Sequence, residues 1–168
     1  MNPIFKYFLL IIFILVACDH GIDPGEPEST STTANPTGIR GKIFYQNWPP
    51  LDSLYNLKLV IFKNYPPGDI VGEVTGGNAI AYPEVLDENL PYFQDSTGYT
   101  IELAAGTYEY IAVAQQYGPG LFFDWQAVGQ YDTTLQDTIP TAITVIQDSM
   151  FSNINIHVDF DSLPGQPF

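Results

Sequence analysis

The sequence predicts an all-β fold, a single antiparallel β-sandwich of about seven or eight strands. From Gly38 onward, short apolar runs alternate with turn-forming residues, and no stretch keeps the 3.6-residue period of an amphipathic helix. The closing segment has the period of two that a half-buried strand requires, with polar residues alternating with Ile154, Ile156, Val158 and Phe160. Many short strands separated by turns are typical of a sandwich or a barrel.

Eight segments are expected to form the strands, and turn-forming pairs such as Pro49-Pro50, Gly76-Gly77 and Pro119-Gly120 lie between them. The expected strands are 39–46, 57–64, 70–74, 99–103, 107–117, 125–131, 142–146 and 153–160. Segment 79–97 does not fit this pattern. We expect it to be a long insertion, in which 83–88 forms one helical turn.

Three motifs at the ends of these strands resemble a known domain family. They are Gly38-Ile39-Arg40-Gly41-Lys42-Ile43, the strand 99–103 running through Ala105-Gly106 to Tyr108, and the closing segment 154–160. They resemble the prealbumin-like, or carboxypeptidase-regulatory-like, β-sandwich modules, in which a tyrosine two residues past a turn glycine enters the core. The resemblance covers about 38–160 and implies the immunoglobulin-like sandwich but no catalytic residue. Ala105 stands where proline is common, and 79–97 has no counterpart.

The first eighteen residues have the pattern of an export signal. An apolar run covers 7–17, which is shorter than the roughly 20 residues that span a bilayer and suits the apolar region of a signal peptide. Leu15-Val16-Ala17-Cys18 resembles the lipobox of bacterial lipoproteins. This resemblance implies that 1–17 is cleaved and that Cys18 carries the lipid that attaches the protein to a membrane. The alternative is an ordinary signal peptide that ends at a cysteine by chance.

Residues 18–37 are rich in Pro, Gly, Ser, Thr and acids, so we expect a flexible tether there, followed by the sandwich at 38–161 and a tail at 162–168. Asp19 resembles an inner-membrane retention signal of enteric bacteria, whereas Bacteroidota-like lipoproteins use nearby acids for surface export. The composition, rich in Tyr, Phe, Asn and Asp, resembles the second group. We therefore expect a lipid-anchored envelope protein, in the outer rather than the inner membrane, facing the periplasm or the cell surface.

Charge and motifs exclude several functional classes. The chain carries 19 acidic and 5 basic side chains, a net charge of −14, which disfavours nucleic acid as a partner. One cysteine and two histidines provide neither an internal disulfide nor the usual zinc site. No hydrolase, zinc-protease, P-loop or EF-hand motif is found in the sequence. We therefore expect no enzymatic activity and no required cofactor.

The acidic residues have two interpretations. The first is a solvated surface that keeps the protein soluble. The second is a Ca²⁺ site, because carboxylates are hard oxygen ligands. The candidate ligands are loop acids whose spacing is not diagnostic, namely Asp124, Asp132, Asp137, Asp159 and Asp161.

Large aromatic residues near the predicted loops are candidates for a binding surface, although each could also belong to the core. The preferred candidates are Trp48, Tyr117, Phe122 and Trp125. The expected function is therefore that of a lipid-anchored, noncatalytic envelope module that binds a protein or carbohydrate partner. The alternative is a structural or accessory subunit of an outer-membrane assembly or uptake system.

Overall fold

The computed structural model describes residues 35–134 and 139–168. The strands are β1 (Gly38–Gln46), β2 (Asn56–Phe62), β3 (Ala79–Tyr82), β4 (Ser96–Glu102), β5 (Gly106–Tyr108), β6 (Tyr110–Gln116), β7 (Trp125–Gln130), β8 (Ile143–Val145), β9 (Met150–Phe151) and β10 (Ile156–Asp159). The helical elements are the 3-10 turn η1 (Leu51–Ser53) and the helix α2 (Ile70–Thr75). Within the described ranges, no helix has the length and apolar character needed to cross a membrane.

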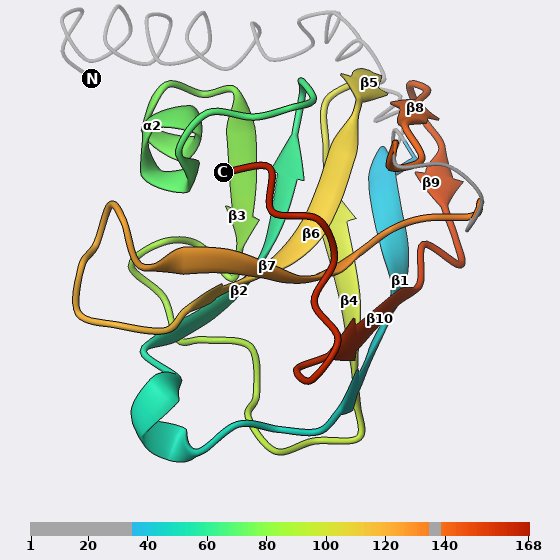
Figure 1. Cartoon of the computed structure of the whole chain (residues 1–168). Helices are drawn as coiled ribbons and strands as arrows, with labels where there is room; N and C mark the ends of the chain where they lie inside the picture. The colour runs from blue at the N-terminus through green and yellow to red at the C-terminus, as the bar shows by residue number, and fades with distance from the viewer. Residues whose placement is uncertain (1–34, 135–138) are drawn as a thin grey trace, which may run out of the picture. The chain divides into compact units, whose positions relative to one another are not determined.

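Eight strands form one curled sheet in the order β3-β2-β6-β7-β10-β1-β4, with β9 beside β1 (Figure 1). β5 and β8 form a separate two-stranded sheet. Side chains of both sheets, such as Ile43 of β1 and Tyr108 of β5, belong to one buried apolar cluster. The predicted all-β fold is confirmed, and its layers are sandwich-like.

The pairing around β1 is mixed rather than purely antiparallel. β1 runs antiparallel to β4 but parallel to both β9 and β10. The reason is the route of the chain, because β9 pairs with Gly38 and Ile39 at the start of β1, so β10 then enters in the same direction as β1. The connection passes close over Gly41, where a Cβ atom would overlap the carbonyl of Ile154. Glycine is therefore required at this crossing.

The central strands β2 and β6 are buried on both faces, so their sequences read as continuous apolar runs. Leu57, Leu59 and Ile61 point into the main core, while Val60 and Phe62 belong to a second cluster on the outer face. This second cluster includes Ile70 of α2, and Phe168 packs against it. The outer face of β2 and β6 is therefore largely shielded from water by other parts of the chain.

The prediction of a strand at 70–74 was wrong, because this segment forms α2. The β-branched residues suggested a strand, but the Asp69 carboxylate accepts a hydrogen bond from the Gly72 amide at 2.7 Å and caps a helix. The helix ends at Thr75 with Gly76 as its C-cap, and Gly77 follows with a φ of +75°, a conformation that favours glycine. Local capping at both ends therefore overrides strand propensity.

The predicted insertion 79–97 contains a strand that the sequence did not indicate. β3 pairs antiparallel with β2, from Leu59 opposite Tyr82 to Phe62 opposite Ala79. The segment 83–88 forms a turn in which the Asp87 amide donates to the Glu84 carbonyl at 2.9 Å. The predicted strand 107–117 is divided between β5, which pairs with β8, and β6, which pairs with β2 and β7.

The C-terminal residues 162–168 lie against the sheet. The Gln166 side chain accepts from the Ala127 amide at 2.9 Å and donates to the Ala127 carbonyl at 3.0 Å, so it bonds both backbone groups of one β7 residue. The rings of Phe168 and Phe62 have their centroids 6.0 Å apart. This segment therefore adds a cover to the outer cluster.

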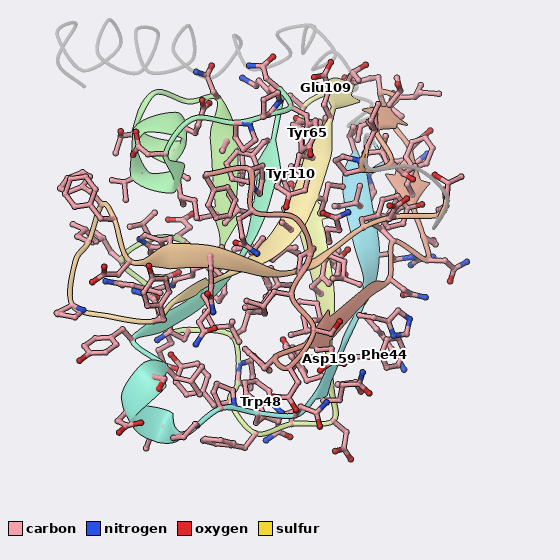
Figure 2. The ribbon with its side chains drawn as sticks, viewed as in Figure 1. Phe44, Trp48, Tyr65, Glu109, Tyr110 and Asp159 are labelled. Carbon is pink, nitrogen blue, oxygen red and sulfur yellow. The ribbon has the colours of Figure 1, made fainter. Side chains whose placement is uncertain are left out.

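Two buried tyrosines differ in how their hydroxyl groups are paired. The Tyr99 hydroxyl donates to the Ile154 carbonyl at 2.5 Å. The Tyr110 hydroxyl has no hydrogen-bond partner among the described residues, although Tyr110 is fully buried beside Tyr65 (Figure 2). Burial raises the pKa of both groups, and it raises the pKa of Tyr45 to about 12. All three phenols are therefore held in the neutral form.

We expect Tyr110→Phe to raise the free energy of unfolding by up to about 1 kcal/mol, because it removes a buried hydroxyl that has no partner. Tyr99→Phe is the matched control, expected to lower it by about 1–2 kcal/mol because it leaves the Ile154 carbonyl unpaired. Urea unfolding at neutral pH measures both changes. Equal losses in the two variants would show that the Tyr110 hydroxyl has a partner.

The raised pKa values also predict how the stability of the protein changes at alkaline pH. Unfolded tyrosines titrate near pH 10, whereas the folded protein keeps these protons to higher pH, so stability falls as the pH rises above about 10. Tyr110→Phe should make this fall shallower, since one raised pKa is removed. A pH-independent unfolding midpoint between about pH 10 and 12 would contradict the expected link.

Candidate functional site

An apolar groove of about 230 Å³ lies on the outer face of the sheet, beside α2. Its floor is formed by outward-facing residues of β2 and β3, and its sides by α2, the turn 83–88 and the loop between β6 and β7. We call this feature the groove. Its lining consists of Asn56, Lys58, Val60, Ile70, Val71, Val74, Thr75, Ala81, Val85, Leu86, Leu121 and Trp125.

Large apolar side chains are exposed at and beside the groove. Leu86 is 98% exposed and Phe123 is 85% exposed, and Phe122, at 54%, has its ring 6.4 Å from that of Phe123. Val85 and Leu121, both in the lining, are also exposed. Single exposed apolar residues are normal, but a group of them around an apolar depression is typical of an interaction site.

The loop 117–124 holds its exposed residues in a defined conformation. The Asp124 carboxylate accepts from the Gly120 amide at 2.6 Å, and the Tyr117 amide donates to the Asp124 carbonyl at 2.9 Å. The Trp125 indole N–H donates to the Leu121 carbonyl at 2.7 Å. The glycines at 118 and 120 leave the room that the Asp124 carboxylate fills. The loop is therefore internally bonded, which lowers the entropy cost of presenting Phe122 and Phe123.

Lys58 holds the turn 83–88, which forms another side of the groove, in place. Its ammonium donates to three backbone carbonyls, those of Glu84 and Asp87 at 3.0 Å and that of Glu88 at 3.1 Å. Lys58 is only 3% exposed, and burial lowers the pKa of its ammonium, an effect partly offset by the Asp87 carboxylate. Because the charge is surrounded by carbonyls, it anchors the turn that carries Val85 and Leu86.

The four aromatic residues proposed from the sequence occupy two separate places. Trp125 lines the groove, and the exposed residues Tyr117 and Phe122 belong to the adjacent loop. Trp48 is not part of the lining. Its indole N–H donates to the Gln94 carbonyl at 3.0 Å, and its ring contacts Tyr45, Tyr92, Phe93 and Phe160 at centroid distances of 4.8–6.4 Å.

Three of the candidate calcium ligands have carboxylates that accept hydrogen bonds from this chain. Asp124 closes its loop, and Asp132 accepts from the Thr134 amide at 2.9 Å and the Thr141 hydroxyl at 3.0 Å. Asp159 accepts from the Asn47 side chain at 2.8 Å and the Asp161 amide at 3.0 Å, bonds that lower its pKa. Asp137, like Cys18, lies outside the described residues.

Residues 35–134 and 139–168 contain no group of three or more His, Cys, Asp or Glu side chains placed to hold a metal ion. Asp161 is exposed and contributes its backbone amide, rather than its carboxylate, to the bond with Asp159. The bonds found at Asp124, Asp132 and Asp159 close or join turns of the chain. In the described residues, these three carboxylates therefore hold parts of the chain together.

The sequence did not identify Lys58, Val74 or Leu86 as site residues. Val74 was assigned to a strand, and Lys58 lies in an apolar run that gives no sign of its three carbonyl partners. Leu86 did carry a signal, because the apolar pair Val85-Leu86 stands between Pro83-Glu84 and Asp87-Glu88 in a turn. An apolar pair at the tip of an acidic turn has no core to enter.

No protein-family model, curated protein or solved structure matches the chain. What the groove can bind is therefore inferred from its lining residues alone. Lys58 is the one ionisable side chain in that lining, and its ammonium is already occupied by three carbonyls. The groove offers apolar contact area and few polar groups.

We expect Lys58→Met to release the turn 83–88, because the three bonds to its carbonyls are lost while the length of the side chain is kept. Hydrogen exchange of the Asp87 amide should accelerate about tenfold, while that of Val113 in β6 stays unchanged. Lys63→Met is the control, since the Lys63 ammonium donates to the Gly77 carbonyl, at 2.8 Å, and not to the turn 83–88 of the described chain. Unchanged Asp87 exchange in Lys58→Met would disprove the anchoring role.

Proposed function

We propose that this chain is a lipid-anchored, noncatalytic module of the cell envelope that binds a protein partner through the groove. The observation that carries the proposal is the apolar depression lined by Leu86 and Leu121, with the exposed Phe122 and Phe123 following Leu121 in the chain. Protein interfaces place apolar and aromatic anchor residues in such depressions and surround them with more polar residues. The described chain has this combination on the outer face of its sheet.

The groove suits a protein side chain better than a carbohydrate. Its volume of about 230 Å³ is below the range of roughly 300–1,000 Å³ that encloses drug-sized ligands, so it accommodates one or two apolar side chains. A sugar also requires several polar groups to replace its bonds to water, since a buried hydroxyl without a partner is costly. The lining is predominantly aliphatic, with Trp125 as its one aromatic residue.

The membrane attachment is proposed from the Leu15-Val16-Ala17-Cys18 motif, and the outer membrane is the proposed location. Acyl chains on Cys18 would hold the module at a bilayer, because each buried CH₂ group contributes about 0.8 kcal/mol. Residues 19–37, rich in Pro, Gly, Ser, Thr and acids, would separate the folded part from the bilayer surface. An anchored module of this kind would meet its partner close to the membrane.

Cys18→Ser should move the protein from the membrane fraction to the soluble fraction, because serine cannot form the thioether to lipid. Fractionation of the producing cells measures the distribution, and the intact mass of the wild-type protein should include acyl groups. Ala17→Ser is the control, since a small residue is kept before the cysteine. Cys18→Ser protein that stays in the membrane fraction would contradict lipid attachment at this residue.

A photoactivatable phenylalanine analogue tests the groove. Placed at position 123 of the full chain in its own cells, it should crosslink to one discrete protein, because Phe123 is exposed and lies in the chain between the lining residues Leu121 and Trp125. The control position is Ile146, which is 59% exposed and follows β8, on the other side of the described fold from α2 (Figure 1).

Adding Leu86→Ser should reduce the adduct at position 123 about tenfold, and this change costs the fold little because Leu86 is almost fully exposed. Ile146→Ser, added in the same way, should leave the adduct unchanged. Equal crosslinking from positions 123 and 146, or an adduct that Leu86→Ser does not weaken, would argue against the groove as the binding site.

A further inference from the structure

We infer that the partner of the groove is a basic protein segment, with one apolar anchor side chain flanked by lysine or arginine. This inference rests on the proposed function and specifies the chemistry of its partner. It is carried by the distribution of charge around the groove, which is strongly unequal.

In the described chain, the free acidic residues at the groove belong to the turn 83–88. Asp69, Glu73 and Asp124 also adjoin lining residues in the sequence, but their carboxylates accept hydrogen bonds from the Gly72, Gly68 and Gly120 amides. The apolar pair Val85-Leu86 has an acid on both sides, Glu84 and Asp87. Glu84 and Asp87 are exposed, and the Asp87 side chain is close enough to raise the pKa of Lys58.

The basic residues of the described chain do not balance these acids. Lys58 lies in the lining, but it is buried and its ammonium is bonded to three carbonyls. Lys63 donates to the Gly77 carbonyl, beyond the C-terminal end of α2. Arg40 and Lys42 belong to β1, which is separated from β2 in the sheet by β6, β7 and β10. The edge of the groove therefore presents negative charge.

Together, the apolar groove and the acidic residues beside it favour a partner with an apolar anchor and flanking basic residues. An apolar side chain in the groove gains from its removal from water, but it does not distinguish one protein from another. Flanking lysines or arginines would lie beside Glu84 and Asp87, which speeds association and disfavours acidic competitors. A partner with flanking acids would instead meet like charges and a protein of net charge −14.

The exposed residues Leu86, Phe122 and Phe123 raise the alternative that the groove region inserts into a bilayer. Membrane-binding surfaces combine apolar residues with lysine and arginine, because cellular membranes carry anionic lipids. The groove has acids in these places, so a cationic protein segment fits the charge better than an anionic membrane does. Vesicle binding is therefore one of the outcomes that the experiment distinguishes.

The probe is a pair of synthetic peptides with the same single central Phe anchor, flanked by lysines in one and by glutamines in the other. Fluorescence anisotropy measures their binding to the full chain in a nonionic detergent. At low salt the lysine peptide should bind at least about tenfold more tightly than the glutamine peptide. In about 1 M salt, where the Debye length is about 3 Å, this difference should fall below about twofold.

Matched variants test which acidic residues cause the difference in affinity between the two peptides. Glu84→Gln with Asp87→Asn should remove most of the advantage of the lysine peptide and leave the glutamine peptide unchanged. Glu102→Gln with Asp148→Asn is the control, because it removes the same number of charges near the start of β1, on the other side of the described fold from α2 (Figure 1). Leu86→Ser should weaken both peptides, because it acts on the apolar contact.

The outcomes separate this inference from the proposed function. Equal binding of the two peptides, weakened by Leu86→Ser, would overturn the basic partner while supporting the groove as a binding site. Failure of the lysine peptide to bind, or an unchanged advantage in the Glu84→Gln and Asp87→Asn variant, would also overturn it. Binding to anionic phosphatidylglycerol vesicles that depends on Phe123, with no peptide binding, would assign the region to a membrane surface instead.

Discussion

The burial of β2 and β6 on both faces is the constraint on which the rest of the structure depends. A strand with apolar residues on both sides requires a cover over each face, and the curled sheet provides one only for its inner face. The outer face is covered by α2 and by the C-terminal segment that ends in Phe168. These covers leave part of the outer face open beside α2, and the groove lies there. The candidate site is thus a continuation of the outer core to the surface.

Lys58 shows how a polar group is accommodated in this apolar setting. Removing an ammonium group from water is unfavourable, and its lowered pKa reflects that cost. Three carbonyls of the turn 83–88 replace the lost water and hold the turn in place. The same bonds determine where Val85 and Leu86 stand. A charge in the floor of the groove therefore supports an apolar surface, rather than offering a charged site to a ligand.

The fold class and most strands could be predicted, because strand periodicity and turn residues are local signals. β1, β2, β7 and β10 lie within or close to their expected ranges. The helix α2 was missed because its β-branched residues outweighed the capping by Asp69. The parallel pairing of β1 could not be read from the sequence, since it depends on a contact that passes over Gly41 from the far end of the chain. Of the candidate site, only the aromatic loop 117–125 was indicated, because the groove requires three separated segments to meet.

The pairing of the first strand with the last also affects when the protein can fold. Along this seam, the Lys42 backbone amide donates to the side-chain oxygen of Asn155, 113 residues later in the chain. Contacts between residues so distant in sequence form slowly, because the entropy of closing the intervening chain is lost before they are made. A nascent chain that lacks β10 has no partner for Ile43–Gln46 on that side of β1 and cannot complete its sheet. The native sheet therefore stays out of reach until β10, which follows every other described strand in the sequence, has been synthesised.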